Sequence, residues 1–320
     1  MLPKNIQCPV CNGQSKFISL FKREFILDQL ELYYSERPPA EIILNDYEML
    51  RCENCSLEYA FPLEAGSQSF YQWITNHSGY YPHHRWEWFT VIEQMGKTSS
   101  VTINLLEIGS GSGKFLEMAT QNLPNLQRSV GLDTTETSVK SCLDKGLEVY
   151  PETLENFLLK ASKESQENFD FIVAFHCLEH INNPKNLIKC MLRLLKPNGS
   201  IFLSTPYSPM SFENAWFDPL NHPPHHLTRW NASAYKELAR QFGLEVKLFM
   251  PQAQNLINRT LYALNLAENG PAHLVSRWKT ALSALQHPLA TFRELQYQSR
   301  RQKVNHQIAG DVVLVELTRY

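Results

Sequence analysis

Short apolar runs alternate with amphipathic segments between residues 101 and 205. The apolar runs predict strands at 101–108, 127–133, 147–150, 169–175 and 200–205. The segments between them predict helices, and Asn183 with Pro184 supplies a cap and a first-turn proline for the last of these. Repeated strand–helix units of this size indicate a parallel sheet with helices on both faces.

The segment after this unit predicts two further strands. Residues 206–230 predict an irregular loop dense in proline, histidine and aromatic residues. A helix at 232–242 and a strand at 244–249 follow, and 311–319 predicts a closing strand. The fold class we expect is therefore α/β, with a doubly wound, mostly parallel seven-stranded sheet.

The N-terminal third has a different pattern, without a long helical stretch in its first 62 residues. Residues 63–100 are rich in aromatic side chains, and 83–95 predicts a helix. The domain boundaries that we expect are 1–62 for a small N-terminal domain, 63–100 for a linker and covering helix, and 101–320 for the α/β domain, with a helical insertion at 253–308.

Composition narrows the class of protein. The chain has 320 residues, 43% of them hydrophobic, and a formal net charge of −2, which gives no electrostatic attraction to nucleic acid or to an anionic membrane. No apolar run approaches the ~20 residues that span a bilayer, and the first ten residues lack the apolar core of a signal peptide. We expect a cytoplasmic protein without a membrane span.

Four of the seven cysteines form two Cys-x-x-Cys pairs, Cys8 with Cys11 and Cys52 with Cys55. Two such turns supply four thiolates for a tetrahedral, coordinatively closed Zn²⁺ site, so the predicted zinc is structural. A redox role is the alternative, although thioredoxin-type motifs belong to a βαβ unit, which this region does not resemble. The sequence predicts a zinc ribbon.

A glycine-rich turn follows the first strand of the α/β region. Gly109, Gly111 and Gly113 lie between that strand and a helix, Glu107 ends the strand, and Asp133 ends the next one. Glycines let a ligand approach the backbone, and a carboxylate at the second strand end accepts hydrogen bonds from ribose hydroxyls. The G-x-G-x-G spacing differs from the dinucleotide fingerprint. A plain turn, a helix cap at Asp133 and an ordinary strand-end acid at Glu107 are the alternatives.

The order LLEIGSGSG, VGLD, FDFIVAFHCLEHINNP, LLKPNGSIFLSTP resembles the class I S-adenosylmethionine-dependent methyltransferases over about residues 100–250. The resemblance implies a Rossmann-like methyltransferase fold and S-adenosylmethionine as cofactor. It also implies an adenine contact within 151–154. The cofactor residues that it implies are Glu107, Gly109, Gly111, Gly113, Asp133 and Phe175.

Two residues upstream of the first strand are further candidates. Tyr80 or Arg85 is expected to contact the methionine end of the cofactor, since aromatics and a basic residue in this position often close over it in this family. A surface arginine beside packed aromatics is the alternative.

The loop at 214–230 concentrates histidines where this fold covers its substrate. His225 and His226, with His176 at the end of the fourth strand, are the candidate catalytic residues, because histidine accepts protons near neutral pH. Structural pinning of the loop and metal binding are the alternatives. Arg229 is a candidate for holding an anionic substrate group, and Trp216, Phe217 and Trp230 for stacking on a sugar or base.

The loop and ribbon are similar to those of bacterial methyltransferases of sugar and polysaccharide biosynthesis. The resemblance implies a small-molecule acceptor, such as a sugar, nucleotide-sugar or glycan-like compound, with O-, N- and C-methylation all open. An RNA methyltransferase that grips its substrate through the ribbon is one alternative, disfavoured by the acidic charge balance. A non-catalytic cofactor-binding scaffold is another. No pattern predicts the oligomeric state.

Overall fold

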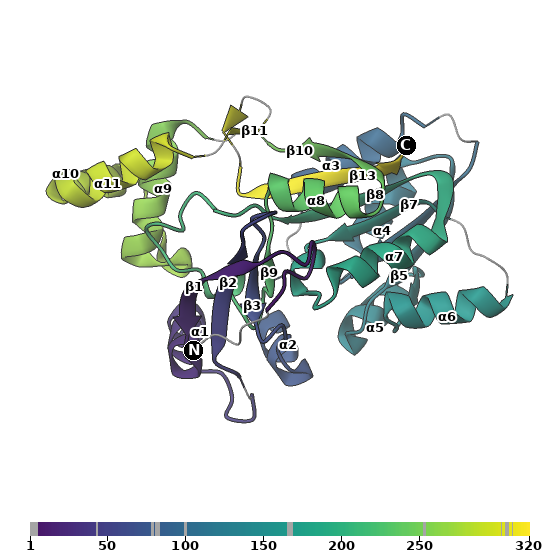
Figure 1. Cartoon of the computed structure of the whole chain (residues 1–320), viewed down its shortest axis with the longest axis horizontal. Helices are drawn as coiled ribbons and strands as arrows, with labels where there is room; N and C mark the ends of the chain where they lie inside the picture. The colour runs from purple at the N-terminus through teal and green to yellow at the C-terminus, as the bar shows by residue number, and fades with distance from the viewer. Residues whose placement is uncertain are drawn as a thin grey trace.

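The computed structural model describes residues 6–42, 44–77, 80, 84–98, 101–164, 169–251, 254–301, 303–304, 307–308 and 310–320. A seven-stranded sheet crosses the larger part of the molecule (Figure 1). Its strands are β4 (Ile103–Ile108), β5 (Leu126–Leu132), β6 (Glu148–Tyr150), β7 (Phe169–Phe175), β8 (Leu195–Pro206), β10 (Leu244–Phe249) and β13 (Val312–Arg319).

The strand order is β10-β13-β8-β7-β4-β5-β6. β13 pairs antiparallel with both of its neighbours, whereas the other adjacent strands pair in parallel. The predicted doubly wound, mostly parallel sheet is confirmed. The chain moves outward from β4 to β6 and then crosses to β7, which creates a switch point between β4 and β7, where ligands of such folds bind.

Helices cover both faces of this sheet. α3 (Trp86–Met95), α4 (Lys114–Asn122) and α5 (Glu136–Asp144) pack on one face, with Leu105 and Val173 in their core cluster. α6 (Leu154–Glu164), α7 (Pro184–Leu194) and α8 (Ala232–Gln241) pack on the other face, with Leu106 and Ile172. Neighbouring strand residues thus point to opposite cores, as the period of a strand requires.

Local signals explain where several elements begin. The side chain of Asn183 accepts a hydrogen bond from the backbone N–H of Asn186, so α7 has the predicted cap. The helix predicted at 83–95 begins at Trp86. Arg85, which the sequence placed inside this helix, precedes it as the cap residue and has extended backbone. β8 starts at Leu195, which pairs with Phe169 of β7. The register then shifts, and the next paired residue of β8 is Ser200, opposite Phe171.

A second sheet lies beside the first. It contains β1 (Ser15–Phe21), β2 (Tyr47–Cys52), β3 (Glu58–Phe61) and the short β9 (Thr228–Arg229), all antiparallel. β9 comes from the loop after β8, so the chain returns to the N-terminal sheet after building most of the large one. α2 (Gln68–Thr75) follows this sheet and packs in the same core.

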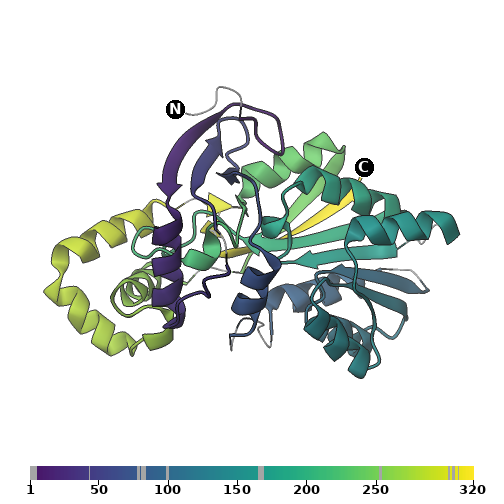
Figure 2. The ribbon, with the colours of Figure 1, turned by 90° about the horizontal axis from the view of Figure 1, so that it is seen from below.

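The sequence did not predict α1 (Arg23–Tyr34), which lies beside this sheet (Figure 2). The helix buries Ile26 and Leu30, but Phe25 is half-exposed and Leu32 is largely exposed. Apolar residues on both sides of the helix blur the 3.6-residue period that marks an amphipathic helix.

The insertion between β10 and β13 is mainly helical, as predicted. It contains α9 (Leu256–Asn269), α10 (Arg277–Gln286) and α11 (Pro288–Ser299), followed by the short pair β11 (Lys303–Val304) and β12 (Gln307–Ile308). The three helices project from the body of the molecule in both views (Figure 1, Figure 2). Within the described residues, no helix has the length and apolarity to cross a bilayer.

Candidate functional site

A cavity of about 1060 Å³ opens at the carboxyl ends of β4, β5 and β7. Its lining includes Gly109 and Gly111 of the glycine turn and the strand ends Ile108, Leu132 and Phe175, whereas Gly113 lies outside the lining. The loop after β8 contributes His225 and His226. Sites for one small ligand have volumes of about 300–1,000 Å³, so this cavity has room for a cofactor together with a small acceptor.

The glycine turn has backbone that only glycine adopts easily. Gly109, Gly111 and Gly113 have φ of 73°, 51° and 76°. A Cβ on Gly113 would lie 2.5 Å from the side chain of Leu147 and 2.8 Å from Sγ of Cys142, whereas one on Gly109 would meet only ordinary contacts. Conformation requires both glycines, and close packing against α5 additionally requires Gly113.

Two carboxylates flank the turn. Asp133 accepts hydrogen bonds from the backbone N–H of Gly111 and of Thr135, each at 2.8 Å, so it fixes the turn while facing the cavity. Glu107 is buried, and its Oε2 has no hydrogen-bond partner. Burial raises the pKa of Glu107 well above its ordinary value, and the charge of Asp133 adds to the rise. An unsatisfied buried acceptor of this kind fits a ligand that carries N–H or O–H donors.

The other predicted cofactor residues also line the cavity. Phe175 packs edge-on against Phe115 with a centroid distance of 4.7 Å and closes the end of β7. Within the segment expected near adenine, residues 152–154 are lining residues, and so are Tyr80 and Arg85. Burial lowers the pKa of Arg85, while the nearby charge of Glu87 opposes the change; the guanidinium Nη1 is 3.9 Å from Glu87 Oε1.

His176 lies between two carboxylates just beyond β7, where it has a positive φ of 49°. Its Nε2 is 3.0 Å from Glu87 Oε1, and its Nδ1 is 3.3 Å from Glu179 Oε1 in a poorly aligned contact. Burial alone would lower the pKa of His176, but the contacts with Glu179 and Glu87 outweigh it and raise the pKa. A ring that holds its proton more tightly is a weaker candidate for a free base.

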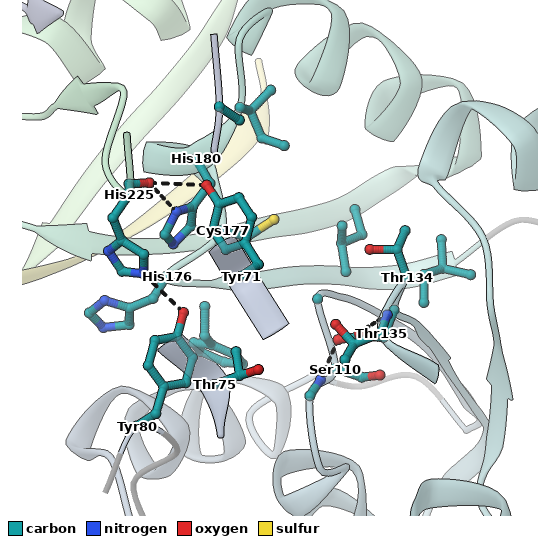
Figure 3. Close-up of a pocket in the computed structure, with 18 of the residues that line it drawn as sticks. Tyr71, Thr75, Tyr80, Ser110, Thr134, Thr135, His176, Cys177, His180 and His225 are labelled. Atoms are coloured by element: carbon teal, nitrogen blue, oxygen red, sulfur yellow. Dashed lines mark hydrogen bonds between the residues drawn. The ribbon is translucent and has the colours of Figure 1, made fainter. Parts of the chain in front are cut away.

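Three further histidines, His180, His225 and His226, gather at this end of the cavity, and Figure 3 shows the first two. Nδ1 of His180 lies 2.6 Å from the carbonyl of His225, whose own Nδ1 is 2.7 Å from the Leu220 carbonyl. Nε2 of His225 is 3.0 Å from the hydroxyl of Tyr80. Burial lowers the pKa of His180, His225 and His226 alike, and neighbouring histidines lower it further for the last two. The three rings are therefore neutral near physiological pH.

Arg229 and the aromatics of the same loop lie elsewhere. The Arg229 guanidinium is buried and forms ion pairs with Glu58 at 3.0 Å and with Glu213. Neither Arg229 nor the three aromatics predicted to stack on an acceptor (Trp216, Phe217 and Trp230) belong to the cavity lining. The predicted anion contact of Arg229 is wrong because its charge is already compensated by carboxylates that join β3 to the loop.

Other lining residues were missed by the sequence analysis. Tyr33 and Tyr34 come from α1, and Tyr71 and Thr75 from α2. Their aromatic character was visible, but without α1 no pattern brought residues 33–34 to the cavity. Glu87 and Glu179 were likewise not selected, since only the fold shows that both carboxylates approach His176.

The four paired cysteines converge at Cys52, the last residue of β2. Their Sγ atoms all lie within 4.8 Å of one another, with Cys8 3.6 Å from Cys55 and Cys11 3.3 Å from Cys52. Tetrahedral Zn–S bonds of about 2.3 Å place sulfurs about 3.8 Å apart. Backbone N–H groups approach Sγ of Cys8, Cys11 and Cys52 at 3.4–3.5 Å. The donor set and its spacing fit a zinc ion.

Comparisons with known proteins agree with this geometry. Residues 81–248, more than half of the chain, match the methyltransferase domain family, and the chain belongs to that family. The large sheet and its cavity are those of the S-adenosylmethionine-dependent methyltransferases, and this is the class of the protein. An S-adenosylmethionine-dependent methyltransferase from Archaeoglobus fulgidus has the same fold, with a TM-score of 0.50 and 16% identity over 78% of this chain and 100% of that one.

Curated relatives match a shorter segment. The ubiquinone biosynthesis O-methyltransferase of Pasteurella multocida (strain Pm70) is 36% identical over 109 residues, which cover 32% of this chain and 45% of that protein. The mitochondrial ubiquinone biosynthesis O-methyltransferase of Dictyostelium discoideum is 29% identical over 119 residues, 32% of this chain and 35% of that one. The chain thus spans less than half the length of these relatives.

Proposed function

We propose that this protein transfers the methyl group of S-adenosylmethionine to a hydroxyl of a small, ring-shaped acceptor. One observation carries the proposal: a single cavity joins a glycine turn with an unsatisfied buried carboxylate to a group of neutral histidines. The first end suits the cofactor, and the second suits an acceptor whose proton must leave.

The cofactor supplies an electrophilic sulfonium methyl, and the chain supplies its binding site. The backbone of Gly109 and Gly111 would let the cofactor lie against the turn, whose conformation Gly113 supports from outside the lining. Asp133 would accept from the ribose hydroxyls, and Glu107 and Arg85 would face the methionine part. Phe175 would close the apolar side. Because the leaving group is already in the cofactor, the remaining task of the protein is to place the acceptor in line.

His225 and His226 are our candidates for drawing off the acceptor proton. Burial lowers the pKa of both rings, so each is neutral and has a nitrogen lone pair that can accept a proton, although the lowered pKa makes each a weaker base than a free imidazole. His176, which the sequence also suggested, fits a positioning role better, because Glu87 and Glu179 hold its ring and raise its pKa.

The acceptor class follows from the lining. The ring of Tyr71 lies beside His180 and His225, and Tyr33 and Tyr34 add further ring faces and hydroxyls to the lining. This combination suits the C–H faces and hydroxyls of a carbohydrate. We therefore retain a sugar or nucleotide-sugar as the proposed acceptor. A phenol is the second candidate, because the named relatives are O-methyltransferases of ubiquinone biosynthesis.

The four cysteines are proposed to hold a structural Zn²⁺, because four thiolates leave no open coordination position. Thiolate zinc sites belong to reducing compartments, so we also keep the cytoplasm as the proposed location. Mass spectrometry of the intact protein under native conditions tests for the bound Zn²⁺. We expect the double variant Cys52→Ser/Cys55→Ser to lose this ion.

The test of function has two stages. Calorimetry with S-adenosylhomocysteine should show binding of one molecule per chain, and absence of binding would overturn the proposed function. Methyl transfer is then measured on matched panels of hydroxylated sugars, nucleotide-sugars and catechols. Turnover confined to catechols would replace the carbohydrate by the phenol, and turnover on RNA alone would overturn the small-molecule acceptor.

A further inference from the structure

Two groups of metal-ligating side chains converge in the part of the chain that the structure describes, the four cysteines and the three residues His180, His225 and His226. In the second group one ligand atom of each residue lies within 4.8 Å of the others. We propose that these three histidines hold a divalent transition-metal ion such as Zn²⁺ at the acceptor end of the cavity. The inference deepens the proposed function, on which its catalytic role rests.

Hydrogen bonds fix the same tautomer in all three rings. Nδ1 faces a carbonyl oxygen in His180 and His225. In His226 it faces Oδ1 of Asn221 at 3.2 Å, and the amide nitrogen of that asparagine donates to Glu213, which orients the oxygen toward the ring. Since an oxygen acceptor needs a donor, each Nδ1 carries the hydrogen and each Nε2 keeps its lone pair. Metal-binding histidines are oriented in this way, with the second nitrogen donating to a carbonyl.

Glu179 provides an independent observation. Its carboxylate is 1% exposed, and neither oxygen accepts a well-aligned hydrogen bond. Oε1 lies 3.9 Å from Nε2 of His226 and 3.3 Å from Nδ1 of His176. A buried carboxylate without aligned donors is costly, and a cation held by the adjacent imidazoles would offset that cost.

The three ligands are held by the fold and not by one flexible segment. His180 ends a short 3₁₀ turn, Leu178–His180, after β7, and the other two lie in the loop before β9. The backbone N–H of Leu227 donates to the carbonyl of Glu179 at 2.8 Å, which ties the two segments together. The rings of His225 and His226 stack with a centroid distance of 4.6 Å, and His180 meets both edge-on. Because an imidazole lone pair lies in the ring plane, one of the two stacked rings must turn before both Nε2 atoms can face one ion.

Such a ligand set determines the metal and its use. Neutral imidazoles favour Zn²⁺ and other borderline transition metals over Mg²⁺ or Ca²⁺. Three protein ligands leave a coordination position open, as in catalytic zinc sites, in contrast to the closed four-cysteine site. Because all three histidines line the cavity, the acceptor hydroxyl can take that position. The hydroxyl of Tyr80, now 3.0 Å from Nε2 of His225, must move aside.

Coordination would lower the pKa of the acceptor hydroxyl. Its proton would pass to the carboxylate of Glu179, which does not itself line the cavity but lies 3.9 Å from Nε2 of His226. The alkoxide oxygen forms a bond to the methyl carbon while the sulfur–methyl bond breaks, which converts the sulfonium to a thioether. In this refinement the imidazoles of His225 and His226 activate the acceptor through the ion and not as free bases.

Metal content tests the inference without reference to activity. The full chain is incubated with Zn²⁺, freed of unbound ion by gel filtration and analysed by elemental mass spectrometry. We expect about two zinc ions per chain, one at each site. His180→Asn and His226→Asn, which alter separate segments, should each reduce the content to about one. His222→Asn is the matched control: this buried histidine of the same loop donates to the Asp218 carbonyl and does not belong to the group.

Cobalt substitution separates the two sites by their ligands. The four-cysteine site should give strong thiolate charge-transfer absorption with the first Co²⁺, and the second Co²⁺ should add only weak bands. Near-ultraviolet circular dichroism of each variant verifies that the fold is kept, and if a single variant unfolds, the cobalt spectrum of the unsubstituted chain still decides the matter. One zinc per unsubstituted chain, or equal contents in all variants, overturns the inference. Failure of the wider function appears separately, as absent binding of S-adenosylhomocysteine.

Discussion

The two ends of the cavity are built in different ways. The turn and the acids of the cofactor end come from one stretch of the chain, residues 107–133, within which Asp133 accepts from the backbone N–H of Gly111. The histidine end joins Tyr80, His176 and His225, which lie up to 145 residues apart. Figure 3 shows the ends facing each other across the cavity. A local motif thus builds the proposed cofactor site, whereas long-range packing builds the proposed acceptor site.

If this division holds, substitutions at the histidine end should impair turnover and leave cofactor affinity intact. We expect His225→Asn/His226→Asn to lower kcat by about 100- to 10,000-fold, the range for loss of an acid–base group, with the Kd for S-adenosylhomocysteine changed less than about twofold. Steady-state methyl transfer and calorimetry measure the two quantities.

His222→Asn is the control for this double variant, because its ring lies in the same loop outside the cavity lining. Equal loss of kcat in the control would mean that the loop is merely disrupted. A double variant with full turnover would remove both histidines from the reaction.

The cofactor end can be disrupted through its backbone. Gly113→Ala combines left-handed strain of about 1–2 kcal/mol with overpacking of about 1–3 kcal/mol, since its Cβ would meet Leu147 and Cys142. We expect a loss of about 2–5 kcal/mol in the free energy of unfolding, measured in urea. Gly146→Ala is the matched control, with φ of 74° and no atom within 4 Å of its Cβ, and should lose only the strain. Equal losses would contradict the packing argument.

The same contrast explains what the sequence could predict. The succession of strands and helices and the glycine turn follow from local patterns, and Gly109, Gly111 and Asp133 line the cavity where the pattern placed them. The place of Arg229 could not be predicted, because its partner Glu58 is 171 positions away and the short β9 that carries it has no periodicity. α1 was missed for a related reason, since exposed Leu32 obscures its buried stripe.

Asp133→Asn tests whether the negative charge of this carboxylate contributes to binding of the cofactor. A hydrogen bond to a charged group is worth about 1.5–3 kcal/mol, so we expect S-adenosylhomocysteine to bind about 10- to 100-fold more weakly. The thermal stability should fall as well, because the amide can accept from only one of the two backbone N–H groups, of Gly111 and of Thr135, that the carboxylate holds. Asp144→Asn, on the exposed end of α5, is the control for net charge. Unchanged affinity in Asp133→Asn would show that this carboxylate only fixes the turn through Gly111 and Thr135.

Arg85 lies between the two ends, and its variant should have the smallest effect. The side chain lines the cavity near Glu87, where it would bond to the carboxylate of the cofactor. The Arg85 side chain is 24% exposed, and ion pairs that remain open to solvent contribute about 0.2–1 kcal/mol, so Arg85→Gln should weaken S-adenosylhomocysteine about two- to fivefold. 5′-Methylthioadenosine lacks the amino-acid carboxylate, and its affinity should not change. Calorimetry with both ligands decides the matter: equal weakening of the two would mean that Arg85 supports the aromatic residues around it, and no weakening of either would place the methionine end of the cofactor elsewhere.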